Sequence, residues 1–354
     1  MRMIRSMRMA GWLIGLSCSV GAPGYAQDVT TDPVAAGLED ATHEVAATDH
    51  FELRSDPRVA LHHFLLDWAL ADAGEWPAYA PPILEREAWR DSLSADEVRI
   101  WSASVAVYGE ARGRSLLFDR GMVAVRDWAA GSAPRASIPP KDRSLADALE
   151  AALPVYRRRW WPTHDGWNRR WIEAVEPTLD EVGEAVIPRL EAAYGGTWPS
   201  GRIPVDVVVH ANDVGAYSVG GRVTISSWNR NIVMPHAVDV MFHEASHVAS
   251  LEGPLTAAID GAYRVSGGEP PERLWHDAIF FTTGEILRLV LEERGPSDFR
   301  PYAEAAGVYA RGERWARQLP AFREHWLPFL ESRSSDPVAR REALEAFARA
   351  LLAN

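Results

Sequence analysis

Residues 236–251 read HAVDVMFHEASHVASL, and this stretch decides how the rest of the chain is interpreted. Its apolar residues, among them Val238, Met241 and Phe242, are numerous enough to bury the segment against a core. The segment is long enough for about four helical turns, and Gly253 and Pro254 follow it as helix breakers. We therefore expect a partly buried helix from about His236 to Leu251.

Three polar residues inside this helix carry recognisable chemistry. A separation of four positions puts the imidazoles of His243 and His247 on one helix face, about 6 Å apart. This suits two corners of a zinc tetrahedron with Zn–N distances of about 2.0–2.1 Å. Glu244 points about 100° around the axis, beside such a metal, where it can accept a proton from an attacking water. The pattern predicts two metal ligands and a general base; the alternative is two histidines that are merely hydrogen-bonded.

Outward from the helix, the chain changes character at Pro204. A β-branched run at 205–209 and a second strand at Arg222–Ser227 precede the helix, and Pro270 and Pro271 introduce another helix over about 273–293. Helical periodicity dominates before residue 200 and again in the tail. We predict an α+β fold that is predominantly α-helical: a helical N-terminal half, then a small mixed sheet with an edge strand, the metal-binding helix and further helices.

The N-terminus has the features of an export signal. Arg2, Arg5 and Arg8 precede an apolar stretch, and cleavage is expected near Ala26. We therefore assign residues 1–26 to a signal peptide and 27–50 to a loose leader, with a periplasmic or secreted product. A helical region at 51–200 and a catalytic region at 201–354 would follow, or one continuous domain. No later segment approaches the roughly 20 apolar residues of a transmembrane helix.

Composition excludes several classes of function. The formal net charge of −12 makes nucleic acid an unfavourable partner. Cys18 is the only cysteine and lies in the predicted signal peptide, so disulfides, thiolate nucleophiles and cysteine-ligated metals are excluded from the mature chain. The 15 tryptophans indicate a large aromatic core, an aromatic-lined cleft, or both. No feature indicates an oligomeric state.

Together, the HExxH pentapeptide at 243–247 and the preceding strands resemble the zincin metallopeptidases, over about residues 203–293. In that group a strand with one free edge precedes the HExxH helix and pairs with the substrate backbone. The resemblance implies that Arg222–Ser227 is this strand, that the cofactor is Zn²⁺ and that the substrate is a peptide or protein.

The third zinc ligand must come from elsewhere in the chain. In the gluzincin branch it is a glutamate on a following helix, and Glu285 in the sequence FTTGE resembles it. It lies farther from His247 than in thermolysin-like members, and Leu289 replaces their second carboxylate, so no specific family is assigned. His276 is the rival ligand. The two would lie about 13 Å apart along one helix, so both could hardly bind one ion.

Further candidates for this ligand are Glu252, Glu269 and Asp277. If Glu285 binds the metal, His276 becomes a candidate transition-state donor. Tyr217 is a candidate for stabilising an oxyanion, although packing is its commoner role.

The sequence therefore predicts an exported zinc metallopeptidase. Two alternatives remain open: a zinc amidase acting on peptidoglycan, and a non-catalytic binding or structural protein with a vestigial HExxH helix.

Overall fold

The computed structural model describes residues 44–75, 89–211, 215–248 and 251–353, which belong to one compact unit. The predicted signal peptide at 1–26 lies outside these residues, as does most of the predicted leader. The fold is α+β and predominantly helical, as the sequence indicates. Helices occupy these segments: α1 Pro57–Asp72, α2 Ala95–Gly109, α3 Arg120–Ala129, α4 Arg143–Arg159, α5 Trp161–Tyr194, α6 His236–Val248, α7 Glu252–Val265, α8 Leu274–Arg294, α9 Tyr302–Ala305, α10 Gly312–Ala321, α11 Leu327–Glu331 and α12 Pro337–Leu352.

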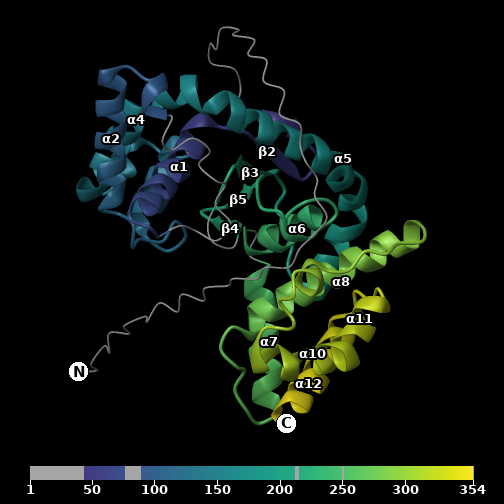
Figure 1. Cartoon of the computed structure of the whole chain (residues 1–354). Helices are drawn as coiled ribbons and strands as arrows, with labels where there is room; N and C mark the ends of the chain where they lie inside the picture. The colour runs from purple at the N-terminus through teal and green to yellow at the C-terminus, as the bar shows by residue number, and fades with distance from the viewer. Residues whose placement is uncertain (1–43, 76–88, 212–214, 249–250, 354) are drawn as a thin grey trace, which may run out of the picture. The chain divides into compact units, whose positions relative to one another are not determined.

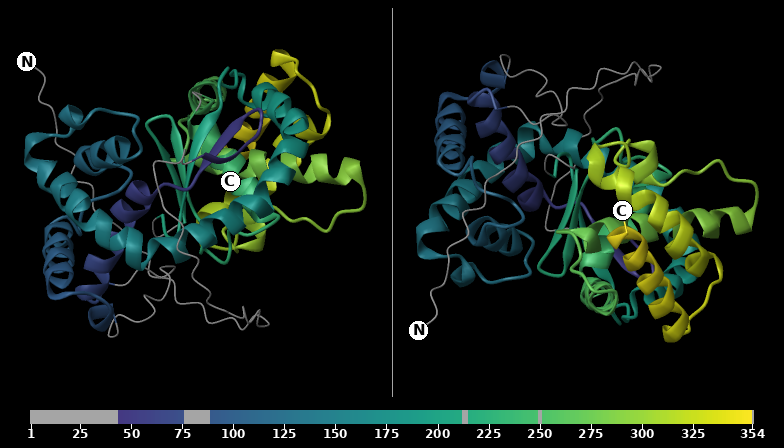
Figure 2. Two further views of the ribbon diagram at one scale, coloured as in Figure 1. Left: turned by 90° about the horizontal axis from the view of Figure 1, so that it is seen from above. Right: turned by 90° about the horizontal axis from the view of Figure 1, so that it is seen from below.

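The five-stranded sheet is mixed and has the order β1-β2-β3-β5-β4. Strands β2, β3 and β5 are parallel, whereas β1 and β4 are antiparallel to their neighbours at the two ends. Figure 1 shows the strands between the N-terminal helices α1, α2 and α4 and the helices α6 and α8, and Figure 2 shows this arrangement from above and below. The strands are β1 Glu44–Ala47, β2 Phe51–Arg54, β3 Ile203–Val208, β4 Ala216–Val219 and β5 Arg222–Ser226.

Alternate strand residues enter two separate hydrophobic cores, as the two-residue period of a strand requires. Val207 and Ile225 pack in a core that includes residues of α5, α6 and α8. Val208 and Tyr217 join the other core, which is built mainly from α1 to α4. Much of the tryptophan content lies in this second core, where the rings of Trp101 and Trp160 are 4.2 Å apart between centroids. The sheet thus separates helices α1 to α4 from the HExxH helix α6.

Two predicted boundaries differ from the structure. β1 lies within the segment expected to be a loose leader, and β2 lies within the region expected to be helical. β1 could not be predicted from the sequence, because its residues Val45 and Ala46 are only partly buried and the strand needs no large apolar residue. β2 pairs in parallel with β3, so the segments before and after residue 200 contribute to one sheet.

The predicted edge strand is also wrong. Arg222–Ser226 forms β5, which lies between β3 and β4, whereas the terminal strand is β4. Helix α7 was not expected, since Gly253 and Pro254 were interpreted as a helix stop. Pro254 instead occupies the first turn of α7, where its missing N–H costs no hydrogen bond.

Helix α8 passes very close to the α6 region at Gly284. A Cβ atom at this position would lie 2.6 Å from Cβ of Pro301 and 3.3 Å from a carboxylate oxygen of Asp239 on α6. The small residue therefore permits the close packing that places α8 beside the HExxH helix. Among the described residues, no helix is both long and apolar enough to cross a membrane.

Candidate metal centre

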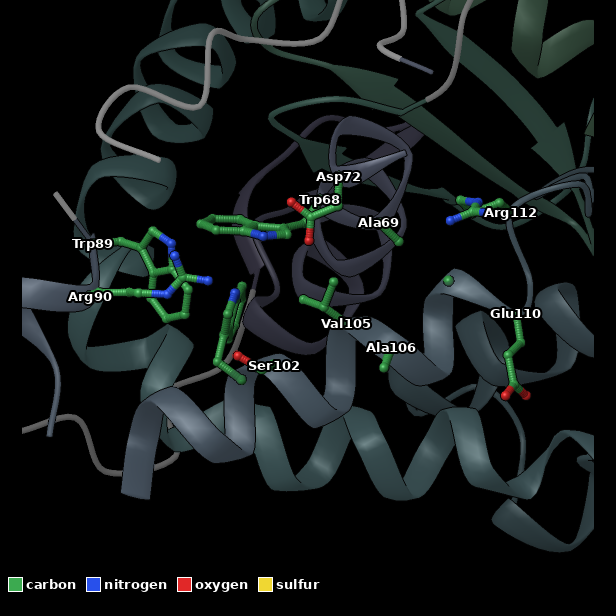
Figure 3. A pocket seen from close by; sticks show the side chains of 12 residues that line it. Trp68, Ala69, Asp72, Trp89, Arg90, Ser102, Val105, Ala106, Glu110 and Arg112 are labelled. Atoms are coloured by element: carbon green, nitrogen blue, oxygen red, sulfur yellow. The ribbon is translucent and has the colours of Figure 1, made fainter. Parts of the chain in front are cut away.

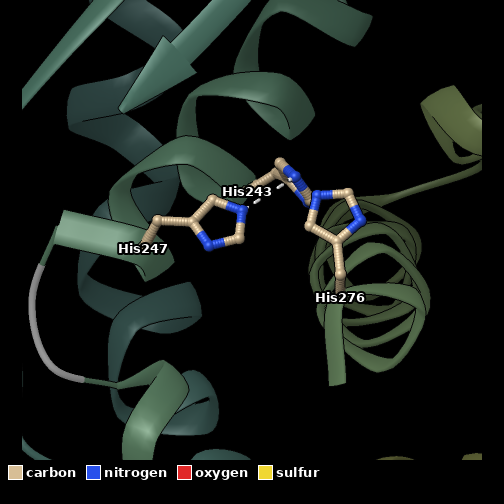
Figure 4. A group of neighbouring side chains, drawn as sticks. All are labelled: His243, His247 and His276. Carbon is tan, nitrogen blue, oxygen red and sulfur yellow. Dashed lines mark hydrogen bonds between the residues drawn. The ribbon is translucent and has the colours of Figure 1, made fainter. Parts of the chain in front are cut away.

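Three histidines from two helices converge on one point (Figure 4). His243 and His247 project from α6, and His276 projects from the first turn of α8. One nitrogen of each ring lies within 4.8 Å of the other two, and this group could hold a metal ion. The pair on α6 was predicted from its spacing, and the structure adds the third imidazole.

The donor geometry of the α6 pair fits a tetrahedral metal. Nε2 of His243 and Nε2 of His247 face each other at 3.2 Å. Two nitrogens bound to one zinc at 2.0–2.1 Å with a tetrahedral angle lie about 3.3 Å apart. One nitrogen of each of the three rings lies within 4.8 Å of the other two, so a small movement of the His276 ring toward the pair would complete this geometry. Three neutral imidazoles with one open position form the donor set of a catalytic rather than a structural zinc site.

Neighbouring side chains fix the orientation of these rings. Nδ1 of His247 is 3.0 Å from a carboxylate oxygen of Glu252, so its proton is donated outward and Nε2 keeps a lone pair toward the cluster. Such carboxylate–imidazole pairs orient metal-binding histidines and make them more basic. The ring of Phe280 stacks on His243 with 3.8 Å between centroids. Glu252, one of the candidate ligands, is therefore a hydrogen-bond partner of His247.

Burial keeps the imidazoles in the form that binds metal. Desolvation, followed by the neighbouring His247 and His276, lowers the pKa of His243 well below its ordinary value. Burial also lowers the pKa of His276 to about 3, with smaller contributions from His247, Arg273 and Arg314. Neutral rings offer lone pairs to a cation without first losing a proton, so both side chains are prepared for metal binding near neutral pH.

Glu244 is buried next to this cluster, with 8% of its surface exposed. Its carboxylate Oε2 accepts a hydrogen bond from Ser218 Oγ at 2.7 Å. Burial raises its pKa, whereas His247 and the Ser218 hydrogen bond act in the opposite direction. A carboxylate with a raised pKa is a better proton acceptor, and this suits a general base. Ser218 was not expected from the sequence.

The structure does not bring Glu285 to the histidines. Its Oε2 accepts a hydrogen bond from Arg288 at 2.7 Å, one turn farther along α8. It lies nine positions after His276, which corresponds to about 13 Å along the helix axis. Its burial beside Asp239 of α6 places it two turns beyond the cluster. The structure therefore brings His276, the rival candidate for the third ligand, to His243 and His247, and it does not bring Glu285 there.

Tyr217 also lies away from the cluster. Its side chain is 2% exposed and its hydroxyl is 2.8 Å from Nε2 of His63 on α1, across the sheet from Glu244. Adjacent strand residues point to opposite faces, so Ser218 faces Glu244 and Tyr217 cannot. The structure therefore does not bring Tyr217, the candidate for stabilising an oxyanion, to the histidine cluster.

The two remaining candidate ligands are not in the cluster. Asp277 follows His276 but is buried against Arg314, with 3.1 Å between their charged atoms. Glu269 is exposed in the segment between α7 and α8. Neither joins the only group of potential metal ligands found among the described residues.

The helical region contains a separate cavity of about 670 Å³ (Figure 3). Trp68, Trp89 and Trp101 contribute to its wall, together with Arg90 and Glu110. None of its lining residues belongs to the histidine cluster, so the cavity is not a substrate site for chemistry at these histidines.

Asp239, one turn before His243, makes the stability of the fold depend on pH. Burial raises its pKa to about 7, and Glu285 adds to the shift, while a hydrogen bond from the backbone N–H of Tyr302 opposes it. The folded chain therefore keeps a proton on Asp239 that the unfolded chain loses near its ordinary pKa of 3.8. Raising the pH from about 4 to 7 consequently favours unfolding.

We expect Asp239→Asn to remove this decrease in stability with rising pH. The amide stays neutral, and its oxygen can still accept a hydrogen bond from the backbone N–H of Tyr302. The variant should exceed the wild type in unfolding free energy above pH 7, by up to about 4 kcal/mol, and match it near pH 4. Urea unfolding across this range, with a chelator present to exclude metal binding, measures the difference. A constant difference at all pH values would contradict the assignment.

No family model, no curated protein and no solved structure matches this chain. The case for a function therefore depends on the geometry of the site.

Proposed function

We propose that this protein is a zinc-dependent metallopeptidase of the zincin type, in which His243, His247 and His276 hold Zn²⁺ and Glu244 is the general base. One observation carries the proposal: three imidazoles converge on one point, and a buried carboxylate follows the first of them on the same helix. A merely structural role for the α6 histidines would not require two nitrogens to face each other at 3.2 Å.

Each side chain has a defined part in amide hydrolysis. A bound zinc supplies a Lewis acid that lowers the pKa of water and polarises a carbonyl group. Glu244 accepts the proton of the attacking water at its carboxylate and returns it to the departing amine, so the net change is one water added across one amide bond. Glu252 holds His247 in the tautomer that directs Nε2 to the metal. Export from the cytoplasm, predicted from residues 1–26, belongs to the same proposal.

Metal depletion and reconstitution test this proposal. Purified protein treated with a chelator should lose hydrolysis of casein, and one equivalent of zinc per chain should restore it. Hydrolysis of purified cell wall but not casein would replace the peptidase by an amidase at the same site. A chain that binds no zinc, or that binds it and hydrolyses neither material, would overturn the proposal in favour of a non-catalytic protein.

A further inference from the structure

Ser218 on the terminal strand β4 directly orients the Glu244 carboxylate. Its hydroxyl oxygen lies 2.7 Å from Oε2 and 2.8 Å from the backbone carbonyl oxygen of the same residue. The hydroxyl has a single proton to donate, and both acceptors belong to Glu244, so either bond holds this residue against the strand. The orientation of the proposed base therefore depends on where β4 lies.

The opposite face of β4 is attached to helix α1. Nδ1 of His63 is 2.8 Å from the carbonyl oxygen of Val59 and must donate its proton there, so Nε2 accepts from the Tyr217 hydroxyl at 2.8 Å. Both side chains are 2% exposed. Removing one partner of such a buried hydrogen bond lowers the stability of the fold by about 1–3 kcal/mol. It fixes Tyr217, and with it the adjacent Ser218.

Helix α3 fixes the end of the same strand. The Arg126 side chain is fully buried and donates from Nη2 to the carbonyl oxygen of Val219 at 3.0 Å. Its charge is balanced by Asp127, and its guanidinium lies 5.9 Å from the centre of the Tyr217 ring. Burying an arginine costs several kcal/mol unless its partners compensate, so this contact strongly disfavours displacement of the strand.

The turn after β4 allows this close contact. Gly220 and Gly221 have φ values of 65° and 76° and connect the paired residues Val219 and Arg222, as in a two-residue type I′ hairpin. A Cβ atom on Gly220 would lie 3.3 Å from Nη2 of Arg126. The glycine therefore serves both the left-handed backbone and the approach of the guanidinium.

We propose that the helical N-terminal region positions the general base: Arg126 and His63 hold β4 from one face, so that Ser218 on the other face orients Glu244. This inference rests on the proposed function, because it assigns positioning residues to the proposed base. It gives the helical region a role that its sequence alone does not suggest. Positioning matters because a displacement of about 1 Å can cost on the order of 10²-fold in rate.

Removal of single hydroxyl groups tests the inference. Ser218→Ala should lower kcat about 10-fold to 100-fold, with KM and zinc affinity unchanged, and Ser218→Thr should restore most of the loss because it retains a hydroxyl. Tyr217→Phe should lower kcat in the same direction although Tyr217 does not touch Glu244. Ser226→Ala is the control: Ser226 on β5 is fully buried, whereas Ser218 is partly buried, and its hydroxyl donates to the Val209 carbonyl at 2.6 Å instead of to Glu244.

Ser226→Ala should reduce thermal stability and leave kcat unchanged. If both serine variants lose kcat in proportion to their stability, the role of Ser218 is only structural and the inference fails. An active Ser218→Ala enzyme with wild-type kcat, or a crystal structure of it with Glu244 unmoved, would also refute positioning while the peptidase assignment stands. A wild-type chain that binds zinc but hydrolyses nothing refutes the proposed function itself, and the positioning role with it.

Discussion

Glu244→Gln is expected to lower kcat by about 10²–10⁴-fold while zinc remains bound. Glutamine keeps the size of the side chain and an oxygen that can accept from the Ser218 hydroxyl, but an amide cannot accept the proton of the attacking water. Glu244 lies outside the group of three imidazoles that could bind metal, so its neutralisation removes no ligand. The measurement is kcat for peptide hydrolysis alongside zinc content by metal analysis.

The same substitution at Glu252 is the matched control. Glu252 also lies beside a histidine of the cluster, but it contacts the outer nitrogen of His247. Glu252→Gln should therefore weaken zinc binding, by about 10-fold to 100-fold, and leave kcat nearly unchanged once zinc is saturating. Full activity in Glu244→Gln would show that another group is the base. Loss of zinc from that variant would show that Glu244 is a ligand.

The part of the site that the sequence predicts is the part that one helix determines. His243, Glu244 and His247 lie within two turns of α6, and the period of an α-helix sets their relative directions without any tertiary information. The amphipathic character of the segment also indicates that it packs against a core. Both expectations agree with the structure because they depend only on local geometry.

The third ligand illustrates what local geometry cannot determine. His276 and Glu285 lie at different levels of α8, and the sequence shows that only one of them can reach a given metal. The turn of α8 that lies beside α6 depends on how the two helices pack. This packing depends in turn on the connection through α7 and on the close approach at Gly284. The resemblance to gluzincins favoured the carboxylate, whereas the packing presents the imidazole.

The order of the strands in the sheet, and the face to which each strand residue points, could not be predicted from the sequence either. The sheet places β5 between β3 and β4, so the last strand before α6 in the chain is not the terminal strand. β4 has four residues, and too short a run shows no clear alternation. β4 was therefore not predicted, and without this strand the sequence does not show that Ser218, and not Tyr217, points to the face that α6 covers. The α+β class, which needs only the types of elements, was predicted correctly.

His276→Ala is expected to weaken zinc binding by more than the roughly 10-fold to 100-fold typical of a lost partner of a ligand. Removing one of three imidazoles leaves two protein ligands, too few for the three that a catalytic zinc site uses. Activity should fall with the zinc content. Competition with a chromophoric chelator measures the affinity directly, and circular dichroism of the metal-free proteins checks that the variant remains folded.

Glu285→Gln distinguishes His276 from the ligand that the gluzincin resemblance implies. The Glu285 carboxylate bonds with Arg288 and lies about 13 Å along α8 from His276, so its neutralisation should leave zinc affinity at the wild-type value. The two variants therefore give opposite results for the two assignments. Retention of zinc in His276→Ala combined with its loss in Glu285→Gln would mean that α8 presents its later turn to the metal, and the three-imidazole site would have to be abandoned.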